Sequence, residues 1–162
     1  MAEIWDLYDA ERRRTGKTMM RGEPVPRGFY TLSVSVWLTN GRGEYLLSKR
    51  HPAKKFPNLW ECTGGGALAG EESLEAGVRE VREELGIILR PGEGGLIYRT
   101  RRDEFQDFYD VWLFRHDAPL SSLTLQPEEV TEARWASRGE IKRLRAAGLL
   151  HPLLDYLDGV II

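Results

Sequence analysis

A run of glycines and a cluster of glutamates stand close together in the middle of the chain. Glycines occupy positions 64–66, and a helix predicted over 73–85 carries Glu80, Glu83 and Glu84. Glycine lacks a Cβ, so a glycine loop can take positive φ and bring its backbone close to a ligand. Residues at i, i+3 and i+4 lie on one side of a helix. Three carboxylates placed there repel one another unless a cation binds between them.

The chemistry that fits this pairing is the binding of a divalent cation together with a phosphate chain. Mg²⁺ and Mn²⁺ prefer oxygen ligands, and Mg²⁺ usually shares a few carboxylates with substrate phosphates and water. A backbone carbonyl of the glycine loop offers one further ligand. Arg79 can reach back to Glu71 and so fix the loop to the helix. The alternative interpretation of the glutamates is an ordinary solvated helix face.

The helix over 73–85 needs an apolar face to hold these groups in place. Its apolar residues recur at helical spacing and form one narrow stripe, Leu74, Val78, Val81 and Leu85. This stripe is expected to pack on a sheet, which leaves the glutamates on the opposite side of the helix. Ser73 is the expected N-cap and Gly86 the expected stop. A close packing contact would explain Gly77 inside the helix.

The remaining elements predict an α/β fold. Apolar runs between turn residues predict strands at 29–39, 44–49, 60–63, 96–102, 108–116 and 129–135. Helices are also predicted at 137–147, with Ser137 as N-cap, and at 152–157. This order of elements indicates a mixed β-sheet sandwiched by helices. Residues 1–27, which are polar and broken by Gly and Pro, are expected to form an N-terminal extension or hairpin packed on a domain at 28–162.

The composition is that of one globular domain with little net charge. The chain has 162 residues, 41% of them hydrophobic, and a net charge of −2. This charge gives no electrostatic case for a stable nucleic-acid partner or for binding to an anionic membrane. Cys62 is the only cysteine, which excludes an intrachain disulfide and favours a buried thiol. No apolar run approaches the roughly 20 residues that span a bilayer. No signal peptide is recognisable, so a cytoplasmic location is expected.

The spacing of residues over 65–87 matches a known signature. Its fixed positions are filled by Gly65, Glu71, Arg79, Glu80, Val81, Glu83, Glu84, Gly86 and Ile87. This pattern resembles the signature of the Nudix hydrolase family. The resemblance implies an α/β/α sandwich with a mixed β-sheet and Mg²⁺ or Mn²⁺ as cofactor. The implied reaction is attack of water on a diphosphate that is linked to another moiety, X.

The resemblance also implies roles for individual residues. The metal-binding positions of the family map onto Glu80, Glu83, Glu84 and the carbonyl of Gly64. The catalytic positions map onto Glu80, Glu83 and Arg79, and the residue at the position of Glu80 is a base in some members. Gly65 and Glu71 map onto structural positions of the loop.

Many members of the family draw a further acidic residue from a loop outside this segment. Glu128 and Glu129, at the start of the last predicted strand, are the candidates here. Glu104, Asp107 and Asp110 compete for the same role.

The flanking residues resemble one branch of the family, the isopentenyl-diphosphate-isomerase-like Nudix proteins. The similar segments are Trp5–Asp9, Arg21-Gly22 and Leu46–Arg50, followed by Lys54, Pro57 and Trp60. In that branch, basic residues after the second strand lie near the diphosphate. The resemblance therefore makes Arg50, Lys54 and Lys55 candidates for substrate binding, together with Glu129. Loop solvation is the alternative role of the three cations.

Two other functions remain as alternatives to hydrolysis. The isomerase pattern places a catalytic Cys and a metal-binding His just after the segment that matches 60–63, but Cys62 lies inside this segment and glycines follow it. No histidine precedes His51, so the N-terminal metal-binding histidines are also missing. A non-catalytic nucleotide-sensing module usually loses part of the acidic cluster, which is complete here. Hydrolysis of a small-molecule diphosphate is therefore favoured, and the resemblance suggests a homodimer.

Overall fold

A mixed β-sheet forms the centre of the structure, a computed structural model that describes all residues 1–162. Its strands are β3 (Thr31–Thr39), β4 (Tyr45–Arg50), β5 (Trp60–Glu61), β6 (Thr63–Gly66), β7 (Gly94–Arg102), β8 (Asp107–Arg115) and β9 (Val130–Ala136). The order is β5-β4-β3-β8-β7, with β6 also paired to β3 and β9 to β4. The central pair β3–β8 is parallel, whereas the other pairs are antiparallel. The predicted mixed sheet is thus confirmed.

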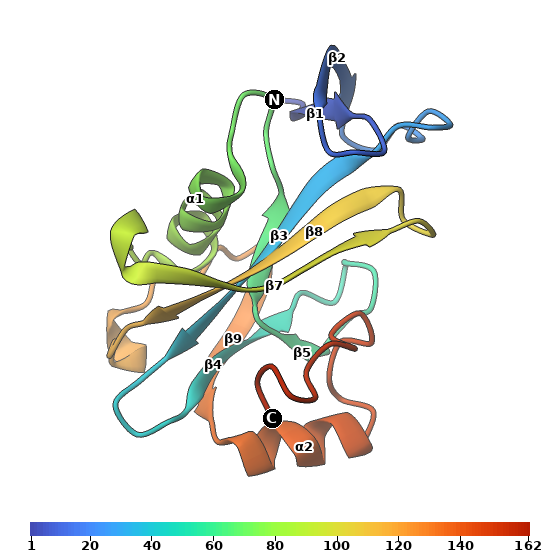
Figure 1. The fold of residues 1–162 in the computed structure, drawn as a ribbon. Helices are drawn as coiled ribbons and strands as arrows, with labels where there is room; N and C mark the ends of the chain where they lie inside the picture. Colours follow the sequence, from blue (N-terminus) through green and yellow to red (C-terminus); the bar gives the residue numbers. More distant parts are fainter.

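Helices cover both faces of this sheet, as Figure 1 shows for α1 (Ser73–Leu85) and α2 (Arg138–Ala146). Successive side chains of a strand point to opposite faces. Val36 of β3 therefore packs in the cluster under α1, and the next residue, Trp37, packs with Ile141 of α2. This arrangement is the α/β/α sandwich expected from the sequence. Two short 3-10 helices, Pro91–Glu93 and Leu120–Ser122, complete the elements. None of the helices has the length and apolar character needed to cross a membrane.

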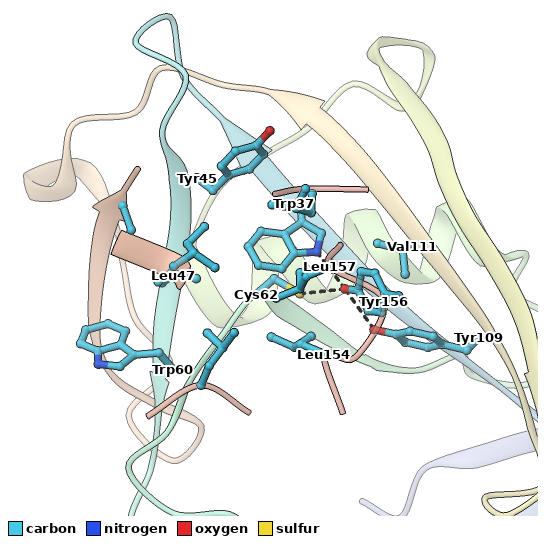
Figure 2. Close-up of a cluster of buried hydrophobic side chains, with 14 residues drawn as sticks. Trp37, Tyr45, Leu47, Trp60, Cys62, Tyr109, Val111, Leu154, Tyr156 and Leu157 are labelled. Carbon is cyan, nitrogen blue, oxygen red and sulfur yellow. Dashed lines mark hydrogen bonds between the residues drawn. The ribbon is translucent and has the colours of Figure 1, made fainter. Parts of the chain in front are cut away.

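The chain after α2 fills the core without forming a helix. Residues 152–157 lie in turns, so the helix predicted there is wrong. Tyr156 and Leu157 are instead inserted into the cluster shown in Figure 2. The Tyr156 hydroxyl accepts a hydrogen bond from Trp37 Nε1 at 2.8 Å and lies 3.4 Å from the Tyr109 hydroxyl. Burial of these side chains decides the backbone path here, because local helix propensity is a weak preference.

The N-terminal end of α1 differs from the prediction, although the bounds of the helix agree with it. The side chain of Ser73 does not cap the helix, because its oxygen accepts a hydrogen bond from Trp112 Nε1 at 2.8 Å. The N-cap is Glu72, whose N–H donates to the Glu75 carboxylate at 2.8 Å. Gly86 ends the helix in the left-handed conformation, with φ of 71°, as predicted.

Residues 1–27 contain a hairpin of β1 (Ile4–Tyr8) and β2 (Arg14–Met20), which lies outside the main sheet in Figure 1. Hydrogen bonds dock β1 onto the loop before α1. The amide of Ala69 donates to the carbonyl oxygen of Ile4, and the amide of Gly70 donates to the Asp6 carboxylate, each at 2.8 Å. The hairpin expected from the sequence is therefore present and is held against the loop that leads into the acidic helix.

Candidate active site

A small cavity lies beside β6 and the second half of α1. Its volume is about 70 Å³, and no apolar residue lines it. The lining comes from distant parts of the chain: Glu3, Arg21, Lys54, Gly64, Gly65, Glu80, Glu83, Glu84, Gln126 and Glu129. Glutamates outnumber cationic residues by five to two in this lining, so the cavity is acidic.

Glycines 64–66 form strand β6, and none of them has a positive φ. The left-handed loop predicted for these glycines is therefore wrong, and close packing is the reason for glycine at all three of these positions. A Cβ on Gly65 would lie 2.5 Å from the carboxyl carbon of Glu80, and one on Gly64 would clash with the carbonyl oxygen of Val34. The absence of side chains lets the Glu80 carboxylate lie directly against the strand.

Arg79 ties the helix, the strand and their connecting loop together. Its Nε and Nη2 donate to the two carboxylate oxygens of Glu71 at 2.7 and 3.0 Å. Nη2 also donates to the carbonyl oxygen of Gly66 at 3.0 Å. Nη1 donates to Glu80 at 2.9 Å and to Glu83 at 3.1 Å. The predicted contact between Arg79 and Glu71 is thus present, and the same guanidinium also orients two of the three clustered glutamates.

The three clustered glutamates have different environments. Glu84 is buried, with 6% of its surface exposed, so the prediction that all three lie away from the sheet is wrong. Burial raises the pKa of Glu84 well above its ordinary value, and the neighbouring carboxylate of Glu80 raises it further. Burial also raises the pKa of Glu80 to about 7, against the opposing effect of Arg79. The Glu83 side chain is 44% exposed.

The donor chemistry of this cavity fits a hard divalent cation, although its ligands do not converge in the structure. No three His, Cys, Asp or Glu side chains are arranged around a common metal position. Glu80 and Glu83 instead bond to Arg79. Glu84 is different, because no hydrogen bond stabilises the charge of its carboxylate. Burial and the neighbouring carboxylates raise its pKa, and the opposing effect of Lys54 does not offset them. A buried carboxylate without a partner is costly, and an oxygen-seeking cation relieves that cost.

The structure brings one of the three candidate substrate-binding cations to the cavity. Lys54 lines it and forms an ion pair with Glu129. Arg50 does not line the cavity, since its guanidinium donates to Glu61 at 2.8 Å. Lys55 also lies outside it, with its ammonium group 5.4 Å from the centre of the Phe56 ring.

Among the candidates for a further acidic residue, only Glu129 lines the cavity. Asp107 and Asp110 are buried and form ion pairs with arginines away from it. Glu104 and Glu128 are exposed and lie outside the lining. Of the five candidates for a further acidic residue, Glu129 is therefore the one that lies close to the clustered glutamates.

Three lining residues were not predicted to belong to the site. Glu3 and Arg21 come from the N-terminal hairpin, and their side chains form an ion pair at 3.1 Å. Gln126 comes from the loop before β9, where its backbone N–H donates to the backbone carbonyl oxygen of Glu84 at 3.0 Å. Arg21 belongs to one of the segments that resemble the isomerase-like branch, but no sequence pattern places these three residues beside the acidic helix, because their proximity arises only from tertiary packing.

Comparison with known proteins identifies the family to which this fold belongs. Residues 29–157 match the NUDIX domain. An uncharacterized Nudix hydrolase of Listeria monocytogenes is 40% identical over 152 residues, which cover 93% of this chain and 89% of that protein. A crystal structure from Deinococcus radiodurans superposes with a TM-score of 0.79 at 24% identity, covering 98% of this chain and 99% of the other. The chain belongs to the Nudix family and is a hydrolase.

The resemblance to the isomerase-like branch also has a counterpart among known proteins. The isopentenyl-diphosphate Delta-isomerase of Escherichia coli is 29% identical over 117 residues, covering 69% of this chain and 64% of that protein. This similarity is lower and shorter than that to the Listeria hydrolase.

Proposed function

We propose that this protein uses Mg²⁺ or Mn²⁺ to hydrolyse the diphosphate linkage of an organic diphosphate. The observation that carries the proposal is the buried Glu84 carboxylate, which has no cationic hydrogen-bond partner and faces a cavity lined only by polar residues and glycine. Nudix hydrolases generally use divalent metal ions. A bound cation neutralises the diphosphate and lowers the pKa of a bound water.

Each residue of the site has a distinct role in this proposal. Glu83, Glu84 and the carbonyl oxygen of Gly64 would hold the cation. Glu80 takes the proton of the attacking water at its carboxylate, because a base with a pKa of about 7 is well matched to neutral pH. Arg79 positions Glu80 and Glu83 through its hydrogen bonds at 2.9 and 3.1 Å.

Lys54 and Glu129 form a pair of opposite charges at another part of the lining. In our proposal, Lys54 contributes positive charge to the bound diphosphate. Both Glu129 and Glu80 are paired with a cation, Lys54 and Arg79 respectively. The proposal assigns the role of base to Glu80 because its pKa is raised to about 7.

The cavity itself limits what the protein can recognise in its substrate. A volume of about 70 Å³ is far below the roughly 300–1,000 Å³ of pockets that enclose a small organic ligand. The lining also offers no apolar surface for a base or a prenyl chain. We therefore propose that the cavity takes the phosphates and that the moiety X remains outside it, next to the hairpin formed by residues 1–27.

The structure also bears on the isomerase alternative. The only cysteine, Cys62, belongs to the core cluster of Figure 2 and is 4% exposed. Burial raises the pKa of its thiol to about 12. A neutral, buried thiol cannot exchange protons with a substrate in the polar cavity, so the observations favour hydrolysis.

A panel of organic diphosphates tests the proposal. The purified protein is incubated with nucleoside triphosphates, nucleotide sugars, dinucleotides and isoprenoid diphosphates, with Mg²⁺ or Mn²⁺, and the phosphorylated products are measured. We expect metal-dependent turnover of at least one substrate class and its loss in Glu84→Gln. Glu128→Gln is the matched control, because this glutamate is exposed and does not line the cavity. Double-bond migration without phosphate release would instead support the isomerase, and binding without turnover would support a sensing module.

A further inference from the structure

Acidic side chains outnumber basic ones in the lining of the cavity, although the proposed substrate is itself an anion. Its five carboxylates face only two cationic side chains, Lys54 and Arg21. The ammonium group of Lys54 is engaged by Glu129. The second cation, Arg21, comes from the N-terminal hairpin, outside the segment that matches the NUDIX domain at 29–157.

Most hydrogen-bond donors of Arg21 remain available to a ligand. A guanidinium carries five N–H donors in a planar fork that matches phosphate oxygens. In Arg21, only Nη1 is bonded, to the Glu3 carboxylate at 3.1 Å, and the side chain is 54% exposed. The amide of Arg21 donates to the carbonyl oxygen of Glu3 at 2.9 Å, which fixes the backbone of both residues at the end of the hairpin.

The hairpin holds Arg21 at the cavity through several contacts with β6 and with the loop before α1. The ring of Trp5 packs on Gly66 so closely that a Cβ on this glycine would lie 2.7 Å from the ring. Arg14 donates to the carbonyl oxygen of Glu71 at 2.6 Å and forms an ion pair with Glu72 at 2.8 Å. Groups on a docked element of this kind are better positioned than groups on free loops.

We propose that Arg21 is a substrate-binding residue that receives a phosphate group of the diphosphate at the mouth of the cavity. The fork of Arg21 can bind two phosphate oxygens at once, whereas Glu3 occupies a single donor of the fork. This inference rests on the proposed function, since it assumes that the diphosphate enters this cavity. It gives the N-terminal hairpin a role in substrate recognition.

Binding of methylenediphosphonate, a diphosphate analogue that cannot be hydrolysed, tests the inference. Its Kd is measured by calorimetry on the full chain, with Mg²⁺ and in EDTA. We expect Arg21→Ala to weaken binding about 10- to 100-fold, the range of a hydrogen bond to a charged group. Arg21→Lys keeps the charge but loses the fork, so its Kd should lie between those of Arg21→Ala and the wild type.

Arg13→Ala is the matched control, because this arginine belongs to the same hairpin but is 73% exposed and does not line the cavity. Its Kd should equal that of the wild type. Because Arg21 is exposed, its variants should unfold at the same urea concentration as the wild type. A Kd of Arg21→Ala within twofold of the wild type, or no binding of the analogue by the wild type, would overturn the inference.

The outcomes separate this inference from the proposed function. If the protein hydrolyses a diphosphate and Arg21→Ala changes neither Kd nor KM, the result supports the proposed hydrolase function and contradicts a role of Arg21 in substrate binding. Arg21-dependent binding of the analogue without turnover of any substrate in the panel supports the binding site and contradicts the hydrolase. Hydrolysis with a raised KM in Arg21→Ala, but not in Arg13→Ala, supports both.

Discussion

Replacement of Arg79 by alanine should destabilise the protein substantially, because three carboxylates lose their partner at once. Arg79 is 12% exposed, and it bonds to Glu71 and Glu80, which are 20% and 12% exposed. A charge-assisted hydrogen bond contributes about 1.5–3 kcal/mol. The bidentate pair with Glu71 therefore contributes most of the loss. The bond to Glu83 adds little, because this side chain is 44% exposed and solvent screens it.

Protonation limits the contribution of Glu80 to this loss. Its pKa is raised to about 7, so near neutral pH part of the lost interaction is avoided when the carboxyl group becomes neutral. We therefore expect Arg79→Ala to lower the free energy of unfolding by about 3 kcal/mol, the low end of the range for broken buried ion pairs. Urea unfolding at about pH 8, followed by tryptophan fluorescence, measures this difference.

Arg82→Ala is the control for this experiment, since Arg82 is an exposed arginine of the same helix and forms no ion pair. Its free energy of unfolding should change by less than about 0.5 kcal/mol. A loss below about 1 kcal/mol in Arg79→Ala would refute the reasoning that this guanidinium holds the site together.

Three further predictions concern the strand, the thiol and a buried carboxylate. Gly65→Ala should abolish hydrolysis, because the added Cβ would lie 2.5 Å from the carboxyl carbon of Glu80 and displace this side chain. Its effect on the free energy of unfolding should be smaller than that of Arg79→Ala, and assays of activity and of urea unfolding measure the two effects. Cys62 should not react with a chromogenic thiol reagent at about pH 8 until the protein unfolds, because burial raises its pKa to about 12. Burial would raise the pKa of Asp110, but hydrogen bonds from Arg12 and Arg99 lower it to about 2. About 2 kcal/mol of stability should therefore be present above about pH 4 and lost as the pH falls toward about 2. Urea unfolding at several pH values should show this loss, which is smaller in Arg12→Ala.

Each of these three predictions has an outcome that contradicts it. Gly95→Ala is the control for the strand variant, since a Cβ there meets no atom within 4 Å. Equal activity of Gly65→Ala and Gly95→Ala would show that Glu80 does not depend on the missing side chain. Rapid reaction of the thiol in the folded protein would show that the core around Cys62 opens. An identical pH dependence in Arg12→Ala would show that this arginine does not stabilise the carboxylate.

The sequence predicted the elements around the site well, because their signals are local. The helix at 73–85, its stop at Gly86 and the N-cap of α2 at Ser137 all follow from short-range patterns. The contact between Arg79 and Glu71 also follows from spacing along one helix and its preceding loop.

The orientation of α1 could not be predicted from its large apolar residues alone. The helix buries Ala76 and Gly77 as well as Val81 and Leu85, so its inner face is rotated toward the side that carries Glu84. Small residues permit this approach, since a Cβ on Gly77 would lie 2.9 Å from Val36 Cγ2. A packing face formed by small residues is a weak signal in a sequence. The stripe of large apolar residues therefore predicts an exposed position for Glu84, which the structure shows to be buried.

The other parts of the site depend on contacts between distant segments. Arg21 and Gln126 reach the cavity through the docked hairpin and through the loop before β9. The capping role of Ser73 was lost to a hydrogen bond from Trp112, a residue of β8. A local sequence pattern shows neither the approach of distant residues to the cavity nor the competing hydrogen bond to Ser73, because both depend on the tertiary arrangement.

In the proposed site, the buried Glu84 carboxylate serves to bind a divalent cation. Titration of the full chain with Mn²⁺, followed by electron paramagnetic resonance of the free ion, tests it directly. We expect the wild type to bind Mn²⁺, the Kd of Glu84→Gln to be at least about tenfold higher, and the Kd of Glu128→Gln to equal that of the wild type. Equal Mn²⁺ binding by the wild type and Glu84→Gln would show that Glu84 is not a ligand of the cation.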